Sequence, residues 1–270
     1  MHAVVLLKQI LDWELPPRKF RIDPATNCPP ADLAPKLLGP FEQNALELAL
    51  QLKDAGVVRK VTALLGGGET GAETLRKALS VRADEAVLVE YAADGPDDPS
   101  QTAAVLARAI ERLGSPELVL AGRQAGDWDY GQVGYLLAER LGRPAVGLVW
   151  RVEQGDGRLH VWRNGPGGIE KLAVRPPAVL TVTNHDSLQL RMSSVLDLMA
   201  ANKKTIERWT TDDLGLGDGE LEAARRLDFD RVWVPEVESV CDFVAGEDPA
   251  EVAAALVGRL VDLKALGSAA

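Results

Sequence analysis

Residues 116–142, PELVLAGRQAGDWDYGQVGYLLAERLG, combine an apolar run, a polar loop and a second apolar pattern. Residues 117–121 are typical of a short buried strand. Residues 132–141 repeat apolar side chains every three or four positions, which predicts a helix. The loop over residues 122–131 therefore connects a strand to a helix, the unit from which α/β sheets are built.

This loop carries two carboxylates, Asp127 and Asp129, and it leads into a helix start that contains Gly131 and Gly134. A helix start exposes unpaired N–H groups, and glycine lets a phosphate approach the backbone closely. The loop is therefore typical of an anion or nucleotide site. It equally fits an ordinary strand-to-helix connection in which an aspartate caps the helix.

Strands and helices alternate along the first half of the chain. Before the opening stretch, three strand–helix pairs are predicted at residues 3–7 and 41–52, 61–65 and 70–79, and 86–89 and 102–113. This alternation predicts right-handed crossovers and a doubly wound, mostly parallel α/β sheet of Rossmann-like type. After the fourth helix, short runs predict added antiparallel strands at residues 145–152, 158–163, 169–174 and 178–182, with Pro176-Pro177 restricting one of them to a sheet edge or boundary.

The chain is expected to divide into a nucleotide-binding domain, residues 1–183, and a C-terminal arm, residues 184–270. Within the arm, residues 193–202 predict a short helix and residues 231–235 at most a short strand. Residues 249–266 predict an amphipathic helix with an apolar stripe. A stripe that follows a linker must pack either on the sheet or on another subunit.

Composition limits the class of protein. The 270 residues are 46% hydrophobic and 26% charged, which is typical of a soluble globular protein. A net charge of −10 argues against a nucleic-acid surface. The isolated Cys28 and Cys241 and three scattered histidines indicate neither a disulfide framework nor a metal site. Apolar runs are too short for a signal peptide or a membrane span, so a cytoplasmic setting without membrane insertion is expected.

A glycine-rich motif, GGGETG at residues 66–71, follows the second strand and opens the second helix. With Glu90 at the end of the next strand, it fits the dinucleotide fingerprint and raises the alternative of an NAD-dependent enzyme. However, the fingerprint belongs on a first strand, and no arrangement for hydride transfer follows. The loops after the first, second and fourth strands are nevertheless expected to meet at one crevice.

Several of these features together resemble the β, or small, subunit of electron transfer flavoproteins. They are Lys8 after the first strand, Gly39-Pro40-Phe41 before the first helix, the glycines after the second strand, GRQAGDWDYGQVG at residues 122–134, and LMAANKK at residues 198–204. The likeness covers residues 1–215. It is strongest at residues 122–134, where the family motif is close to G-(K/R)-Q-A-x-D-x-D-x-x-Q-(T/V)-G.

The resemblance implies a heterodimer with a larger α subunit that makes most of the contacts to a redox-active FAD. It also implies an adenine nucleotide within this chain, either AMP or, in electron-bifurcating members, a second FAD. No catalytic residue is implied, so the chain is expected to be an electron-transfer subunit and not an enzyme. The implied cofactor-binding residues are Leu6, Gly39, Pro40, Phe41, Gly66, Gln124, Ala125, Asp127, Trp128, Asp129, Tyr130, Gly131, Gln132, Val133 and Gly134.

Two departures from the family pattern concern the nucleotide. Gly39 replaces the usual asparagine, which removes a side-chain contact. Bifurcating members usually read D-G-D-T-A-Q-V-G-P, whereas this chain has Trp128, Tyr130, Gly131 and Tyr135 at four of those positions. A tryptophan there would cover a nucleotide face or occupy flavin volume, which favours AMP over FAD.

A later segment matches the family's recognition loop, which docks on a partner flavin dehydrogenase. Its implied contact residues are Arg191, Val195, Leu196, Met199, Lys203 and Lys204, with Val195 at the position of the usual inserting leucine. The implied function is an electron carrier between dehydrogenases and a quinone oxidoreductase or other acceptor. A second alternative is an adenine-nucleotide-binding regulator of the universal-stress type, which would be a homodimer without a flavin partner.

Overall fold

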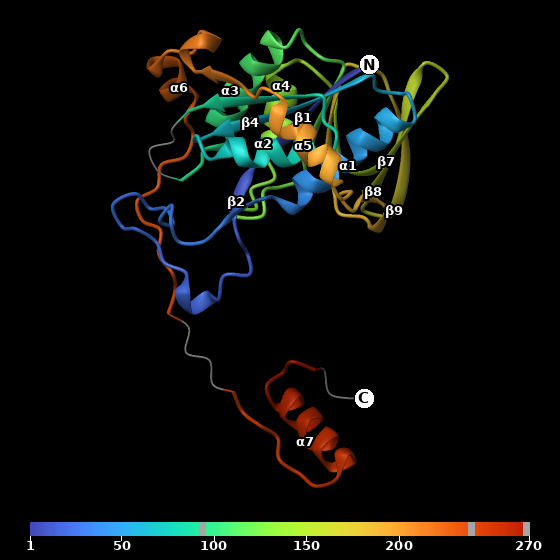
Figure 1. Ribbon diagram of the computed structural model, residues 1–270. Helices are drawn as coiled ribbons and strands as arrows, with labels where there is room; N and C mark the ends of the chain where they lie inside the picture. The colour runs from blue at the N-terminus through green and yellow to red at the C-terminus, as the bar shows by residue number, and fades with distance from the viewer. Residues whose placement is uncertain (92–95, 237–240, 267–270) are drawn as a thin grey trace. The chain divides into compact units, whose positions relative to one another are not determined.

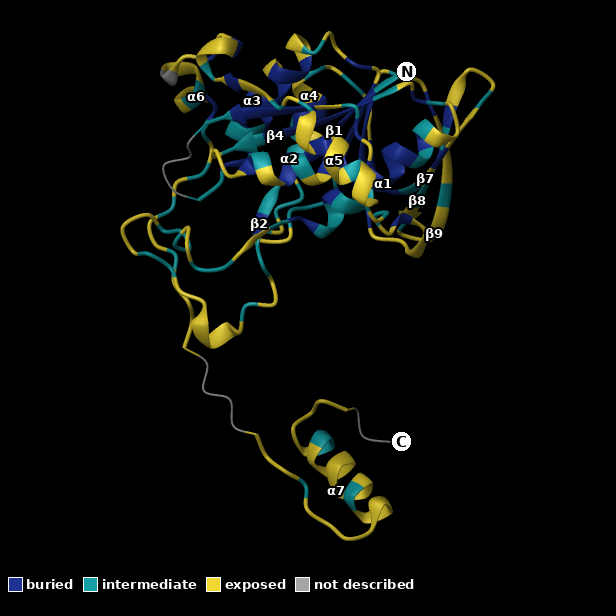
Figure 2. Ribbon diagram, viewed as in Figure 1, coloured by how far each residue is buried: buried dark blue, intermediate teal, exposed yellow. Residues whose placement is uncertain are grey.

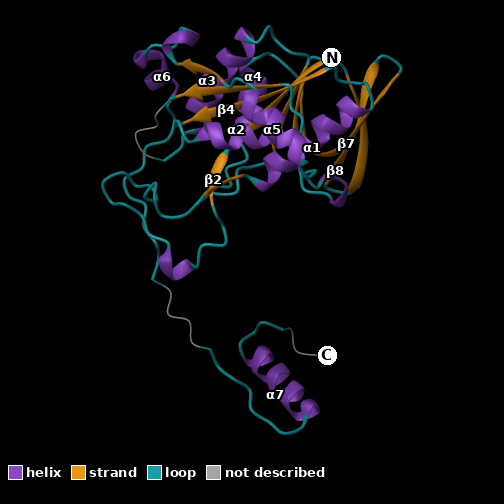
Figure 3. Ribbon diagram, viewed as in Figure 1, coloured by secondary structure: helices purple, strands orange, loops and turns teal. Residues whose placement is uncertain are grey.

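The structure is a computed structural model that describes residues 1–91, 96–236 and 241–266. The chain divides into two compact units, Met1–Trp233 and Val234–Ala270 (Figure 1). The first unit is built on a nine-stranded sheet of order β11-β5-β4-β1-β6-β10-β7-β8-β9. Figure 3 shows these strands as one sheet with helices packed against it.

The sheet is mostly parallel, which confirms the predicted fold class. Neighbouring strands from β11 to β7 run parallel, and β8 and β9 extend the β7 edge in antiparallel fashion. The strands are β1 (His2–Leu7), β4 (Lys60–Gly67), β5 (Glu85–Glu90), β6 (Leu118–Gly122), β7 (Ala145–Gly155), β8 (Arg158–Gly165), β9 (Gly168–Val174), β10 (Ala178–Val182) and β11 (Glu207–Thr210).

Strand β10 departs from the expectation that it would be one of the added antiparallel strands. It lies between β6 and β7 and pairs with both in parallel. All five of its residues are buried, as is typical of a mostly apolar strand inside a sheet that is covered on both faces. The edge position predicted for one of the two strands around Pro176-Pro177 belongs to β9.

Helices cover both faces of the sheet. The buried side chains of α1 (Pro40–Asp54) and α2 (Gly71–Ser80) share one apolar layer with Val5 of β1. Those of α3 (Pro99–Arg112) and α4 (Val133–Arg140) share the other layer with the adjacent Val4. Successive residues of a strand point to opposite faces, so one apolar strand serves both layers. Figure 2 shows this buried centre in dark blue.

The first compact unit extends beyond the boundary expected at residue 183. Strand β11 pairs with β5, and its Trp209 is 8% exposed within the layer formed by α3 and α4. The 3-10 helices Asp186–Leu188 and Asp212–Leu214 and the helices α5 (Val195–Lys203) and α6 (Asp218–Ala224) complete this unit. Apolar side chains after residue 183 thus complete the two apolar layers that cover the sheet. The first unit ends at Trp233.

The remaining elements do not belong to the nine-stranded sheet or to the helices that cover it. Strands β2 (Gln9–Leu11) and β3 (Lys36–Leu38) form a two-stranded antiparallel sheet, and Pro17–Lys19 is a 3-10 helix. Residues 231–235 form no strand. In the second unit, α7 (Pro249–Asp262) confirms the predicted C-terminal helix and leaves Leu256 and Val257 about half exposed. Among the helices that the structure describes, none is long and apolar enough to cross a membrane.

Candidate functional site

A cavity of about 330 Å³ is formed where β1, β4 and β6 end, and the loops that follow these three strands line it. Strand β1 lies between the other two. From β1 the chain passes to β4 and β5 on one side, and it then returns through α3 to β6 on the other side. Such a reversal of strand order is where open α/β sheets bind ligands. The three loops expected to share one crevice therefore do so, and its volume is within the range of small-molecule sites.

Ten of the predicted cofactor-binding residues line this cavity, which extends from the centre of the sheet to the start of α4. They are Leu6, Gly66, Gln124, Ala125, Trp128, Tyr130, Gly131, Gln132, Val133 and Gly134. The other five, Gly39, Pro40, Phe41, Asp127 and Asp129, do not line the cavity, although several of them contact residues that do. Phe41, for example, packs under the guanidinium of the cavity residue Arg123, 4.5 Å from its carbon to the ring centre.

The start of α4 has no side-chain cap. Gln132 at the N-cap makes no side-chain hydrogen bond to the helix. Asp129 instead accepts a hydrogen bond from the side-chain nitrogen of Gln124 at 2.7 Å, and Asp127 accepts one from the backbone N–H of Trp128 at 2.8 Å. The alternative of an ordinary aspartate-capped helix is therefore not what the structure shows. Backbone N–H groups in the first turn of α4 remain for an anion.

Glycines bring the backbone close to its neighbours around this loop. Gly131 has a φ of +62°, a left-handed conformation that glycine adopts without strain. A Cβ atom on Gly134 would lie 2.5 Å from the Cγ2 atom of Thr181. Only a glycine therefore lets the start of α4 pack this closely against β10.

Lys8, directly after β1, is held by two carboxylates at the cavity. Its Nζ atom lies 2.6 Å from Oδ2 of Asp97 and 2.8 Å from Oδ2 of Asp127. Burial acts to lower the pKa of Lys8, but these two negative charges outweigh it and raise the pKa. Lys8 is therefore positively charged at neutral pH. Sequence reasoning missed Asp97, because nothing in its local pattern places it beside Lys8.

Glu42 is a second cavity residue that sequence reasoning missed. Its side chain lines the cavity, the residue is 5% exposed, and Oε2 has no hydrogen-bond partner within the described parts of the chain. Burial raises the pKa of Glu42 to about 8, against the opposing charge of Lys8. A glutamate in the first turn of a helix is ordinary, so the sequence carries no signal for this environment.

The structure also gives a reason for Gly39 at the position where the family usually has asparagine. A Cβ atom on Gly39 would lie 2.0 Å from Oε2 of Glu42. The Glu42 carboxyl thus occupies the space into which a side chain at position 39 would extend. A side-chain group still reaches this part of the wall, but it comes from the first turn of α1.

The glycine-rich motif at residues 66–71 shapes the opposite wall. A Cβ atom on Gly66 would lie 2.9 Å from the ring of Tyr91, whereas one on Gly68 would meet nothing within 4 Å. The hydroxyl oxygen of Tyr91 lies 3.0 Å from Oγ1 of Thr102, and burial raises the pKa of Tyr91 to about 12. Gly66 therefore makes room for a neutral aromatic wall.

Aromatic rings cluster on the loop before α4. Trp128 stacks on Tyr130 with ring centres 5.9 Å apart and planes 16° apart, and its ring centre is 6.0 Å from that of Phe229. Phe229 comes from the segment after α6, which sequence reasoning did not connect to the site. Two bulky rings therefore occupy positions where bifurcating members usually have glycine and threonine.

The predicted recognition residues separate into an exposed group and an anchored group. Val195, Leu196 and Met199 are 72%, 77% and 56% exposed, and Lys203 is also exposed. Lys204 instead donates to the backbone carbonyl of Ala83 at 2.8 Å.

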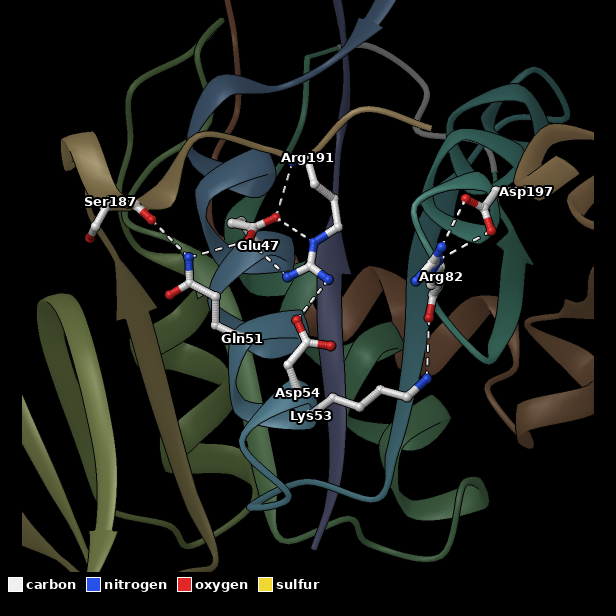
Figure 4. Close-up of polar contacts among 8 residues, drawn as sticks. All are labelled: Glu47, Gln51, Lys53, Asp54, Arg82, Ser187, Arg191 and Asp197. Carbon is white, nitrogen blue, oxygen red and sulfur yellow. Dashed lines mark hydrogen bonds and ion pairs between the residues drawn. The ribbon is translucent and has the colours of Figure 1, made fainter. Parts of the chain in front are cut away.

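Arg191 anchors this segment to α1 (Figure 4). Its Nη2 atom lies 2.9 Å from Oε1 of Glu47, and its Nη1 atom lies 2.8 Å from Oδ2 of Asp54. Arg191 and Lys204 thus hold the segment in place, while Val195, Leu196 and Met199 of α5 are exposed.

The cavity fits an adenine nucleotide by its chemistry. It offers the uncapped start of α4 and two buried polar atoms that have no partner among the described residues, Nε of Arg123 and Oε2 of Glu42. Leu6 forms an apolar part of the cavity wall, and Gly66 forms a part that consists of backbone without a side chain. Within residues 1–91, 96–236 and 241–266, no group of three or more His, Cys, Asp or Glu residues could hold a metal ion.

Comparison with known proteins agrees with this geometry. The sequence matches the family described as electron transfer flavoprotein domain over residues 32–214. It is 34% identical over 262 residues to the caffeyl-CoA reductase-Etf complex subunit CarD of Acetobacterium woodii, covering 96% of this chain and 98% of that protein. It is 35% identical over 221 residues to the electron transfer flavoprotein subunit beta of Clostridium acetobutylicum, covering 82% and 83%. It is 32% identical over 225 residues to the protein FixA of Azorhizobium caulinodans, covering 81% and 78%. With the family match spanning more than half of its length, the chain belongs to the electron transfer flavoprotein β subunit family.

Proposed function

We propose that this chain pairs with a larger electron transfer flavoprotein α subunit and forms an electron carrier between flavin dehydrogenases and a quinone oxidoreductase or other acceptor. The cavity at the ends of β1, β4 and β6 is the observation that carries the proposal. The family's loop over residues 122–134 lines this cavity, and the helix that the loop leads into has no side-chain cap. A bound FAD, held mainly by the α subunit, would supply the redox chemistry. This chain would contribute binding and orientation and no catalysis of its own.

The cavity would hold AMP as a structural nucleotide. The N–H groups at the start of α4 and the guanidinium of Arg123 would bind its phosphate, and Leu6 and Gly66 would contact its base. The stacked rings of Trp128 and Tyr130 support AMP over a second FAD, because they take up volume at this loop.

The exposed apolar face of α5 would dock the dehydrogenase. Met192, Val195, Leu196, Leu198 and Met199 are each at least 46% exposed and lie within eight positions of the sequence. Exposed apolar clusters of this kind mark protein-interaction sites. In the same way, the exposed apolar residues of α7, Leu256 and Val257, would pack on the α subunit.

The experiment that tests the proposal is co-purification with the natural large partner, followed by denaturation and chromatographic measurement of FAD and AMP per heterodimer. One FAD with one AMP is the expected result. Two FAD and no AMP would instead assign a second flavin to the cavity. Absence of both flavin and partner would refute the proposed function, and a stable homodimer would then favour the regulator. Family membership favours neither that regulator nor the NAD-dependent enzyme.

Docking and assembly are tested separately. Leu196→Glu should slow reduction of the complex's flavin by a flavin dehydrogenase at least tenfold, because a charge would be buried at the interface. Asn202→Ala, an exposed change on the same helix outside the predicted contact residues, is the matched control. Deleting residues 234–270 should weaken binding to the α subunit without loss of the first unit's fold, since that unit has its own core. Equal rates for the two point variants would contradict the docking face.

A further inference from the structure

Glu42 has a chemical environment that packing alone does not explain. It is a cavity-lining carboxyl in a residue only 5% exposed, and its Oε2 atom lacks a partner among the described residues. A buried polar atom without a hydrogen bond costs about 1–3 kcal/mol. A group retained at such a cost in a cavity wall is a candidate for contact with whatever fills the cavity.

Among the residues that the structure describes, none of the charged groups around the cavity makes an ion pair with Glu42. Lys8, directly after β1, forms its ion pairs with Asp97 from the segment before α3 and with Asp127 from the loop before α4. Arg123, from that same loop, lies over Phe41.

Two further groups complete the surroundings. Lys36, from β3, lies 3.4 Å from the hydroxyl of Thr70, and the Tyr91 hydroxyl, from the end of β5, lies near Thr102. A buried carboxyl without a paired cation favours its neutral form. A neutral acid has one O–H donor and one remaining acceptor, much like an amide.

We propose, building on nucleotide binding at this cavity, that Glu42 recognises the nucleotide as a neutral carboxylic acid that donates a hydrogen bond to an acceptor atom of the ligand. Rotation about the terminal bond of the side chain is soft, so either carboxyl oxygen can be presented. The neutral acid adds a donor to the wall without placing a negative charge beside a phosphorylated ligand. Ionisation of Glu42 removes the donor and adds that charge.

Binding should therefore weaken as Glu42 ionises. The pKa of Glu42 is raised to about 8 by burial, so about one tenth is ionised at pH 7 and about 97% at pH 9.5. If only the neutral form binds, the Kd for AMP rises about 30-fold across this range. The AMP phosphate has a second pKa of about 6, so it is already fully charged above pH 7.5 and adds no pH dependence there. The raised pKa values of Lys8 and Tyr91 keep both groups in their neutral-pH charge states.

The experiment is calorimetric titration of AMP, and in parallel FAD, into the nucleotide-depleted complex with the α subunit at pH 7 to 9.5. Wild type should lose affinity about 30-fold. Glu42→Gln keeps a donor and an acceptor but cannot ionise, so its Kd should change less than about threefold over the same range. Glu139→Gln, an exposed change on α4, should follow the wild-type profile. Circular dichroism at each pH establishes that the complex is folded.

Tight binding by wild type with a pH-independent Kd would overturn the role of Glu42 while leaving the proposed function intact. The same profile in wild type and Glu42→Gln would overturn it as well. A wild-type complex that carries FAD on the α subunit but binds neither AMP nor FAD at this cavity at any pH would overturn both the role of Glu42 and the nucleotide part of the proposed function. Where a variant fails to assemble, a pH-independent wild-type Kd still overturns the role of Glu42.

Discussion

Replacing Arg191 by alanine removes the ion pair that fixes the predicted recognition segment, residues 191–204, to α1. The guanidinium donates to Glu47 from Nε at 3.0 Å and from Nη2 at 2.9 Å, and it also reaches Asp54 (Figure 4). The Glu47 side chain is 6% exposed. After the substitution its carboxylate would retain only the side-chain N–H of Gln51 at 3.2 Å and the backbone N–H of residue 191 at 3.1 Å.

The expected loss of stability follows from this burial. Removing one partner of a buried pair costs about 3–5 kcal/mol, because the other charge remains unpaired. The Arg191 side chain is 27% exposed, and two N–H donors stay with Glu47, so a loss of about 2–3 kcal/mol is expected. At about 2–4 °C per kcal/mol for a domain of this size, the Tm should fall by about 4–12 °C.

Thermal unfolding followed by circular dichroism measures this change, and Arg82→Ala is the matched control. Arg82 bonds to Asp197 at 3.1 and 3.3 Å, but its side chain is 69% exposed, so its loss should cost under about 1 kcal/mol. Hydrogen exchange over residues 189–200 should accelerate in Arg191→Ala. Equal Tm losses in the two variants, or unchanged exchange, would refute the reasoning that the buried Glu47 makes the anchor strong.

Three further outcomes are expected. Gly66→Val should abolish retention of AMP in the purified complex, because a Cβ atom at residue 66 would lie 2.9 Å from the Tyr91 ring. Gly68→Val should retain AMP, because a Cβ atom at residue 68 would have nothing within 4 Å. Equal retention by the two variants would contradict the cavity geometry. Asp98→Ala should lower the free energy of unfolding by denaturant by about 2–4 kcal/mol, because this buried carboxylate accepts hydrogen bonds from four backbone N–H groups. Burial acts to raise the pKa of Asp98, but the four donors outweigh burial and hold the pKa below its usual range. A loss under about 1 kcal/mol would argue against these hydrogen bonds. Glu42→Gln should gain stability over wild type as pH rises from about 5 to 8. Burial raises the pKa of Glu42 from the ordinary 4.5 to about 8, so the folded wild type keeps a proton that the unfolded chain loses. The unfolding free energy of the wild type therefore falls with pH in this window. A Tm difference that does not change with pH would contradict this last assignment.

Much of the fold follows from patterns local to the sequence. The four strand–helix pairs depend on apolar periodicity within each segment, and residues 116–142 contain the strand, loop and helix start that border the cavity. Because parallel strands end at the same edge, the loops after β1, β4 and β6 could be expected to meet. The parallel pairing of β10 was not predicted, since a short apolar run does not reveal its neighbours in a sheet.

The rest of the site depends on contacts between distant segments. Asp97 reaches Lys8 only once α3 has packed on the sheet, and Phe229 reaches Trp128 from a segment about 100 positions away. Strand β11 is four residues long and carries a single buried side chain, Trp209, so its sequence shows no apolar alternation. Glu42 has the sequence context of an ordinary first-turn glutamate, and only Gly39 and the surrounding loops make it a buried acid.

Helix α1 connects the cavity to the predicted recognition segment. Glu42 in its first turn lines the cavity, and Glu47 holds Arg191. These two residues are about 7.5 Å apart along the helix axis at 1.5 Å per residue. A Cβ atom on Gly122 would lie 2.9 Å from Cβ of Phe41, so the start of α1 also packs tightly against the end of β6. Under the proposed function, a nucleotide in the cavity would support the helix on which the docking segment is anchored. A bound nucleotide that takes no part in electron transfer would then still serve the carrier, because it holds the docking face in place relative to the sheet.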